Sequence, residues 1–134
     1  MATIQTKYLG QLRTEALHVQ SSNKLITDAP TDNNGKGEAF SPTDLASGSL
    51  ASCMMTIMGI IARRHDFDLD GMTADVTKIM VSEPRRIGEI HIKFSWPTPP
   101  EDSKMIEMLK RGALSCPVAL SLHPAIKQVI DFDF

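Results

Sequence analysis

One apolar segment, SPTDLASGSLASCMMTIMGIIARRH at residues 41–65, constrains the fold of this chain more than any other. Its beginning is clear, because Ser41 is a favourable N-cap, Pro42 suits the first helical position, and Asp44 stands three residues after the cap. Basic residues at 63–65 complement the helix dipole at the other end. Apolar and small residues lie on every face between these ends, which predicts a long helix buried all round.

The apolar run within this segment, residues 45–62, is barely long enough to cross a membrane. Its small and polar positions are Ser47, Gly48, Ser49, Ser52, Cys53, Thr56 and Gly59. Because these residues interrupt the apolar run, we expect a core helix and no membrane partner. Small residues at every fourth position would also let another helix approach closely.

Composition narrows the class of protein. The chain has 134 residues, of which 42% are hydrophobic and 22% charged, as in an ordinary soluble globular protein. This length predicts a single domain, residues 1–134, that folds without a disulfide or metal. The net charge of −2 and the scattered basic residues predict no nucleic-acid partner. The N-terminal MATIQTKYLG lacks the pattern of a secretory signal, so we expect a cytoplasmic protein.

The remaining pattern predicts an α+β fold. The expected elements are strands within residues 3–28 with a turn at 21–24, a loop at 29–40, strands at 72–82 and 87–96, an amphipathic helix at 101–114 broken near Gly112, a short helical turn after Cys116, and a strand at 125–134. Strands thus flank the long helix on both sides in sequence.

Cys53 lies in the middle of the apolar helix. A lone cysteine in such a helix is usually a small buried hydrophobic residue. A nucleophile needs the thiolate, and burial among Met and Ile side chains disfavours that charged form. The N-terminus of its own helix is about 15 Å away, too far for the dipole to help. Cys53 therefore needs a group outside its helix to stabilise a thiolate.

Cys116 precedes a proline in the sequence LSCPVALSLHP. If Pro117 is the first helical residue, Cys116 occupies the N-cap, where backbone N–H groups and the dipole favour a thiolate. The residues alone therefore indicate that Cys116 is the more acidic of the two thiols.

The spacing of the two cysteines is far too long for a Cys-x-x-Cys redox motif or a zinc knuckle. The histidines at 18, 65, 91 and 123 show no ligand spacing, so we expect no metal. His123 follows Cys116 by seven residues, which leaves a Cys–His pair open. We favour the interpretation that His123 only forms hydrogen bonds within a loop or at a helix end.

The two cysteine motifs, SPTDLASGSLASC and CPVALSLHP, at this separation resemble the OsmC/Ohr family of small bacterial proteins. The resemblance covers nearly the whole chain, and its most specific points are the helix-borne Cys53 and the Cys116–Pro117 pair. It implies an OsmC-like α+β fold with antiparallel sheets packed on a long buried central helix. It also implies an intertwined homodimer in which two central helices pack together and both subunits shape each active site.

The resemblance further implies a chemistry, since the family is tied to organic hydroperoxide resistance. Cys53 resembles the peroxidatic thiol, which attacks the distal peroxide oxygen, releases an alcohol and becomes a sulfenic acid. Cys116 resembles the resolving thiol, which closes a transient disulfide with Cys53. An external dithiol, lipoyl-bearing in the better known branch, then reduces that disulfide by exchange, without a bound cofactor. An apolar site would suit fatty or aryl hydroperoxides.

One position departs from the family pattern and resembles the OsmC-like branch. Well-characterised peroxidases carry a glutamate ten residues before the first cysteine, where it helps to hold an arginine over the thiolate; here that position is Thr43. Asp44 lies about 900° round the helix from Cys53 and so points to the opposite face. We favour a capping-box role for Asp44, with a contact across the dimer as the alternative. Arg13 is the best candidate for the arginine, and an ordinary exposed strand arginine is the competing interpretation.

The sequence is compatible with three functions. The first is a thiol peroxidase that uses Cys53 and Cys116, assisted by Arg13. The second is a non-catalytic OsmC-like dimer that holds a small hydrophobic ligand and has unreactive thiols. The third is a redox sensor that signals through the Cys53–Cys116 disulfide without fast recycling. We expect the peroxidase, with a small hydrophobic hydroperoxide and a dithiol reductant as its partners.

Overall fold

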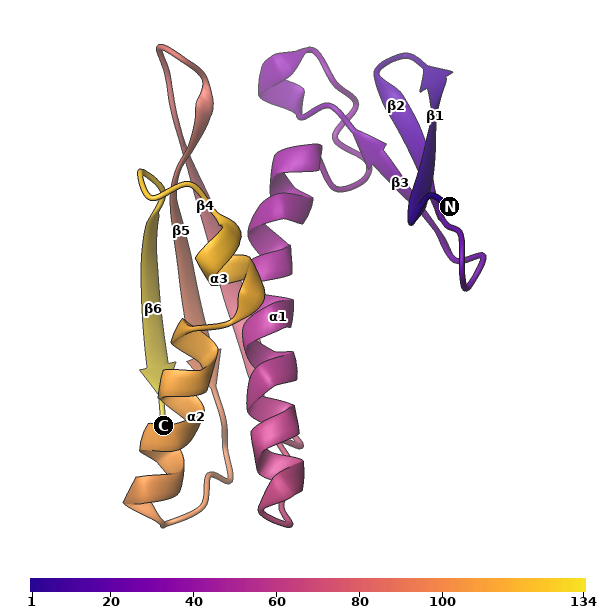
Figure 1. Cartoon of the computed structure of the whole chain (residues 1–134). Coiled ribbons are helices and arrows are strands. Elements are labelled where there is room, and N and C mark those ends of the chain that lie inside the picture. The colour runs from indigo at the N-terminus through magenta and orange to yellow at the C-terminus, as the bar shows by residue number, and fades with distance from the viewer. The chain divides into compact units, whose positions relative to one another are not determined.

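A computed structural model describes all residues, 1–134. The chain forms two compact units, Met1–Ala46 and Ser47–Phe134, and the first helix begins in one unit and continues in the other. The predicted α+β class is confirmed, because two sheets of three strands and three α-helices make up the fold (Figure 1).

The N-terminal unit is built on one antiparallel sheet. Its strands are β1 (Ile4–Gly10), β2 (Arg13–His18) and β3 (Lys24–Asp28), in that spatial order. The register places Arg13 directly opposite Asp28, so both side chains belong to the same face of the sheet. The strands and the turn predicted before β3 are confirmed.

A loop returns the chain from β3 to the long helix. It contains a 3₁₀ turn, η1 (Thr31–Asn33), and is closed where the Asp28 N–H donates to the Phe40 carbonyl at 3.0 Å. Gly35 is required in this loop, because a Cβ there would lie 1.6 Å from the Ala29 carbonyl oxygen. The predicted loop at 29–40 is therefore confirmed and tightly folded.

Helix α1 (Pro42–Arg64) starts with the predicted capping box. The Asp44 N–H donates to Ser41 Oγ at 3.0 Å, and the Ser41 N–H donates to the Asp44 carboxylate at 2.9 Å. This exchange pairs backbone N–H groups that the first turn of a helix leaves without an intrahelical partner.

The C-terminal unit contains the rest of α1 and a second sheet. Its further elements are β4 (Thr73–Val81), β5 (Arg86–Ser95), α2 (Ser103–Leu114), α3 (Pro117–Ser121) and β6 (Lys127–Asp133), with strand order β4-β5-β6. β4 and β5 are antiparallel, but β5 and β6 are parallel. The expectation of purely antiparallel sheets is wrong for this pair, because the chain crosses from β5 to β6 through α2 and α3.

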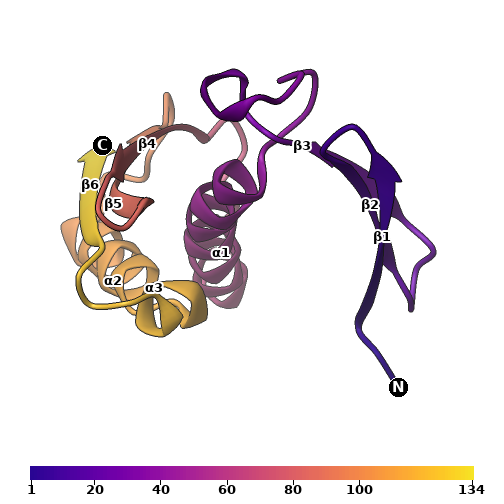
Figure 2. The same ribbon diagram turned by 90° about the horizontal axis from the view of Figure 1, so that it is seen from above.

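The core lies between this sheet and its helices. Alternate residues of β5 are buried, and α1 and α2 lie on the same side of the sheet (Figure 2). The buried residues of α1 are Ser47, Leu50, Ala51, Met54, Met58 and Ala62. They recur at helical spacing and form one face, while Ser49, Ser52, Thr56 and Ile60 are exposed. Within one chain, α1 is therefore buried on one face only. The sequence-based prediction that it is buried all round is wrong for the single chain.

Helix α1 is also long and apolar enough to cross a membrane by length and composition, with a mean hydropathy of 1.7 in its most apolar window. Its buried face nevertheless supplies six residues that pack inside the C-terminal unit. A core helix passes the same test, so the composition of α1 is weak evidence for a membrane span.

Helix α2 begins at the N-cap Asp102, whose carboxylate accepts from the Lys104 and Met105 N–H groups. It continues without interruption through Gly112 to Leu114, so the predicted break is wrong. The glycine serves packing instead, because a Cβ at Gly112 would lie 2.4 Å from Cδ1 of Ile61 on α1. Its missing side chain lets the two helices approach closely.

Candidate functional site

Cys53 lies near the middle of α1, on the border between its buried and exposed faces. Its thiol is free and half-buried. The neighbouring Ser52 is exposed, and Met54 is fully buried. The helix therefore places Cys53 at the edge of the core, neither fully buried nor fully exposed.

Cys116 occupies the predicted N-cap of α3. Its Sγ accepts a hydrogen bond from the Ala119 N–H at 3.4 Å, and Pro117 is the first helical residue. The orientation of α3 is set by β6, because the Gln128 side-chain amide donates to the Ala119 carbonyl at 3.0 Å. Two hydrogen bonds at Ala119 thus connect the Cys116 sulfur with the sheet.

The expectation that the N-cap position makes Cys116 the more acidic of the two thiols is wrong. The residue is fully buried, and this desolvation raises the pKa of the Cys116 thiol above its ordinary value. The hydrogen bond from Ala119 lowers the pKa but does not outweigh burial. The backbone N–H groups of Val118 and Ala119 at the start of this short helix both lower the pKa, but they cannot replace the water that the thiolate would lose.

The structure brings the two predicted cysteines together, although 63 positions separate them in sequence. Cys53 lies close enough to Cys116 that its side chain and the charge of a Cys53 thiolate both raise the pKa of Cys116 further. Both cysteines are free thiols. Such a pair allows one sulfur to react while its neighbour remains protonated.

Arg13 forms a bidentate ion pair within the N-terminal unit. Its Nε and Nη2 donate to the two carboxylate oxygens of Asp28 at 2.7 and 2.9 Å. Only 1% of the Asp28 side chain is exposed, against 30% of Arg13. The Glu38 carboxylate lies 3.6 Å from the same Nη2, and the Glu38 N–H donates to Asp28 Oδ2 at 3.1 Å.

This geometry changes both ionisation equilibria. The hydrogen bond from Arg13 holds the pKa of the Asp28 carboxyl below its ordinary value, and the Glu38 N–H adds to the effect. The Asp28 carboxylate in turn raises the pKa of Arg13. The guanidinium is therefore a fixed charge with a fixed orientation.

Sequence reasoning missed Asp28 and Glu38. Asp28 is the last residue of a strand that runs into a loop, and its partner Arg13 is 15 positions earlier. A hairpin register assigned to β2 and β3 would have placed the two opposite each other. No comparable signal marks Glu38, because the fold of the 29–40 loop brings it to Arg13.

Asp44 and Thr43 have local roles in the structure. Asp44 completes the capping box with Ser41, as predicted. The hydroxyl of Thr43, at the position of the family glutamate, lies 3.2 Å from the Ser41 hydroxyl. Both side chains therefore take part in the start of α1.

His123 is exposed and forms a hydrogen bond within a turn. Its Nδ1 accepts from the Ala125 N–H at 2.9 Å, which fixes the proton of the neutral ring on Nε2. The favoured interpretation as a loop histidine is confirmed. No group of three or more His, Cys, Asp and Glu side chains is arranged to hold a metal ion.

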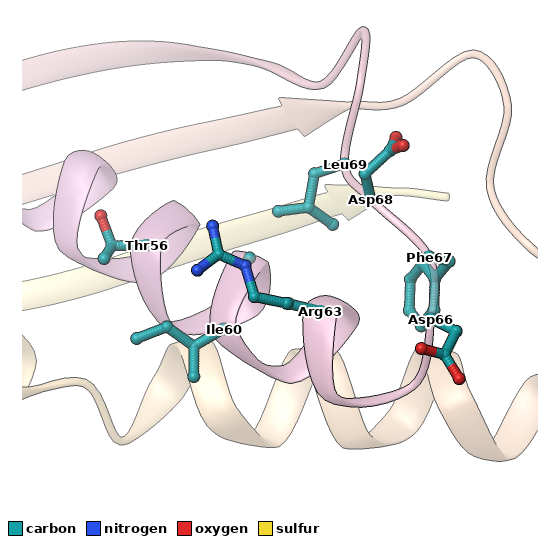
Figure 3. A pocket seen from close by; sticks show the side chains of 8 residues that line it. Thr56, Ile60, Arg63, Asp66, Phe67, Asp68 and Leu69 are labelled. Carbon is teal, nitrogen blue, oxygen red and sulfur yellow. The ribbon is translucent and has the colours of Figure 1, made fainter.

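Each unit has a pocket of small-molecule size. The pocket of the N-terminal unit is mostly apolar, has a volume of ≈ 590 Å³, and is lined by Leu25, Ile26, Gly37, Glu38, Ala39 and Phe40. The pocket of the C-terminal unit, of ≈ 660 Å³, lies at the end of α1. Figure 3 shows Arg63 extending over Ile60 towards Thr56, while the Asp66 and Asp68 carboxylates point away from its guanidinium.

Comparison with known proteins identifies the family. The model of the family described as OsmC-like protein matches residues 35–131. A structure from Psychrobacter arcticus 273-4, proposed to be an osmotic stress induced and detoxification response protein, is 52% identical with a TM-score of 0.94, over 98% of this chain and 96% of that one. No curated protein matches the chain.

More distant structures share the fold. An organic hydroperoxide resistance protein OsmC from Legionella pneumophila is 17% identical, with a TM-score of 0.72 over 100% of this chain and 98% of that one. OhrB of Bacillus subtilis, an organic hydroperoxide resistance protein, is 13% identical, with a TM-score of 0.65 over 98% of each chain. With the family match over residues 35–131, these findings show that the chain belongs to the OsmC-like protein family.

Proposed function

We propose that this protein is a thiol peroxidase that reduces organic hydroperoxides. The observation that carries the proposal is the interaction between the Cys53 and Cys116 thiols in a chain without any other cysteine. Two sulfurs at one place supply both electrons that reduction of a peroxide needs. Relatives named for organic hydroperoxide resistance share the fold and support this choice of substrate.

The different environments of the sulfurs assign their order of reaction. Cys53 is half-buried and accessible, so it acts as the nucleophile. Its sulfur attacks the distal peroxide oxygen, the S–O bond forms as the O–O bond breaks, and the leaving alkoxide takes a proton to become the alcohol. Cys116, fully buried with a raised pKa, stays protonated until the sulfenic acid forms.

Resolution and recycling follow from thiol chemistry. The Cys116 sulfur attacks the Cys53 sulfenic acid, the S–S bond forms, and water leaves. An external dithiol then reduces the disulfide by exchange and restores both thiols. We place the reaction in the reducing cytoplasm, in a homodimer, with Arg13 as the group that favours the Cys53 thiolate.

The test is a single turnover with one equivalent of cumene hydroperoxide. We expect peroxide loss within seconds and a mass lower by two hydrogens in the wild type, no peroxide loss in Cys53→Ser, and accumulated sulfenic acid in Cys116→Ser. Equal peroxide consumption by the wild type and Cys53→Ser would contradict the proposal. Disulfide formation without recycling by any dithiol would indicate a redox sensor.

One observation favours a second candidate, a non-catalytic protein that binds a hydrophobic ligand. Arg13 already faces two carboxylates, Asp28 and Glu38, so the three groups together carry a charge of −1. Such a cluster is a weak stabiliser of a thiolate. Thiols that resist both alkylation and peroxide in the native protein would support this alternative.

A further inference from the structure

Gln128 is a polar residue in an otherwise apolar row of the second sheet. It shares one face of β6 with Ile130 and Phe132, since alternate residues of a strand point to the same side. The parallel register sets this row beside three fully buried residues of β5, which are Ile90, Ile92 and Phe94. An amide among apolar side chains needs a hydrogen-bond partner. Gln128 has one on α3, where its Nε2 donates to the Ala119 carbonyl at 3.0 Å.

Helix α3 depends on such an outside contact. It has only five residues, and helices this short are unstable by themselves. It also buries little apolar surface, because Leu120 is 74% exposed and Pro117 is exposed as well. The bond from Gln128 joins this helix to a strand of the sheet, nine positions further along the chain. We therefore expect the amide to restrict the movement of α3 against the sheet.

The restriction reaches the Cys116 sulfur through one residue. Ala119 accepts from Gln128 through its carbonyl and donates through its N–H to Cys116 Sγ at 3.4 Å. The Cys116 backbone is held separately, because its N–H donates to the Ala113 carbonyl of α2 at 3.2 Å. In Figure 1 and Figure 2 alike, α3 lies between β6 and α1, the helix that bears Cys53. Gln128 thus holds α3 from the β6 side.

The position of this sulfur matters for disulfide closure. In the resolving step the Cys116 sulfur attacks the Cys53 sulfenic acid, the S–S bond forms, the S–O bond breaks, and the hydroxyl leaves with the thiol proton as water. The step is intramolecular, so its rate depends on how often the two sulfurs meet in the reactive geometry. The disulfide itself also has a narrow range of geometry. A helix that moves freely would bring the sulfurs together less often and favour the reduced state.

Resting on the peroxidase function proposed above, we propose that Gln128 is a positioning residue for the resolving step. Its amide holds α3 so that the Cys116 sulfur stays beside Cys53. It takes no part in the attack of Cys53 on the peroxide. Loss of the amide therefore slows disulfide closure and leaves sulfenic acid formation unchanged.

The kinetic test follows both steps of a single turnover with cumene hydroperoxide in Gln128→Leu. Leucine fits the apolar row of β6, so the variant keeps the packing and loses the donor. We expect an unchanged rate of peroxide loss and a rate of disulfide closure, read as the loss of two hydrogens in mass, that is about two- to tenfold lower, the value of one hydrogen bond. An equal fall in both rates would assign Gln128 to the fold in general and overturn the proposal, as would faster closure.

Ser121→Ala is the matched control. The Ser121 hydroxyl also donates to a carbonyl of α3, that of Pro117, at 2.7 Å, but the bond lies within the helix and leaves the contact with β6 intact. We expect the closure rate of this variant to match that of the wild type. An equal slowing in Ser121→Ala and Gln128→Leu would show that the stability of α3 alone sets the rate, and would overturn the role of Gln128.

A test without peroxide separates this proposal from the peroxidase itself. The reduced protein is equilibrated in buffers of reduced and oxidised glutathione, which exchange with the two thiols and give the ratio of protein disulfide to dithiol. We expect this ratio to be about two- to tenfold lower in Gln128→Leu than in the wild type, because the effective concentration of the Cys116 thiol at Cys53 falls. This difference supports the role of Gln128 even if the protein consumes no peroxide. Equal ratios, or a more stable disulfide in the variant, would overturn it.

Discussion

At the scale of single residues, Cys116 shows how burial decides the character of a thiol. Two backbone N–H groups, of Val118 and Ala119, favour the thiolate, but full burial disfavours it more. In the proposed peroxidase this outcome is useful, because a protonated Cys116 thiol would not compete with Cys53 for the peroxide. Oxidation of Cys53 would then remove the part of the pKa rise of Cys116 that Cys53 causes.

Asp28 gives a prediction at the same scale. Its pKa is lowered by Arg13, so its contribution to stability is present above the ordinary carboxyl pKa of about 3.9 and is lost as the pH falls through the lower, folded-state value. Asp28→Asn should therefore lower the urea midpoint at pH 7, because it leaves Arg13 without its bidentate partner.

The pH dependence makes this prediction specific. The difference between the wild type and Asp28→Asn should shrink as the pH is lowered below about 4, since protonated Asp28 resembles asparagine. Glu15→Gln is the control, because Glu15 forms only the longer ion pairs, at 3.5 and 3.7 Å, with the exposed Lys7 and Lys24 on the same sheet. A difference that stays constant from pH 7 to pH 3 would show that the ion pair is not its cause.

Sequence reasoning at this scale succeeded where the signal was local. The capping box at Ser41 and Asp44 and the N-cap position of Cys116 depend on neighbours a few residues away. The raised pKa of Cys116 depends on burial, and the partner of Arg13 depends on strand register. Neither the burial of Cys116 nor the partner of Arg13 can be predicted from a short stretch of sequence.

At the scale of elements, two features lacked a sequence signal. The turn between β1 and β2 places Gln11 and Leu12 at φ of 53° and 63°, a conformation usually marked by Asn or Gly. The parallel pairing of β6 with β5 follows from the path of the chain through α2 and α3. Strand periodicity locates β6 but contains no information about its direction.

The contact between α1 and α2 gives an element-scale prediction. Gly112→Ala should gain about 0.9 kcal/mol of helix propensity, but the new Cβ meets Cδ1 of Ile61. Ile61→Val removes that atom. We therefore expect Gly112→Ala to be more favourable in the Ile61→Val background than in the wild type, by about 1 kcal/mol in urea unfolding. Strict additivity of the two substitutions would show that the helices have room at Gly112.

At the scale of the whole molecule, the apolar core is unevenly distributed. Every buried apolar residue lies between Leu50 and Cys116, so the N-terminal unit contributes none. Its sheet has a charged face with Arg13 and Glu15 and an opposite face on which Ile4 and Tyr8 are 56% and 65% exposed. A three-stranded sheet needs an apolar face that is covered. A second copy of the chain is the cover that the proposed homodimer supplies.

An apolar sheet face that only a second copy covers predicts that folding is linked to dimerisation. Sedimentation should show two chains per particle, and the Tm should rise with protein concentration. Ile4→Glu should weaken the dimer and lower the Tm, because it places a charge on the exposed apolar face. Gln5→Glu adds the same charge one residue later, on the opposite face, and should leave both measurements unchanged. A monomer with a concentration-independent Tm would contradict the homodimer and would leave the N-terminal sheet uncovered in solution.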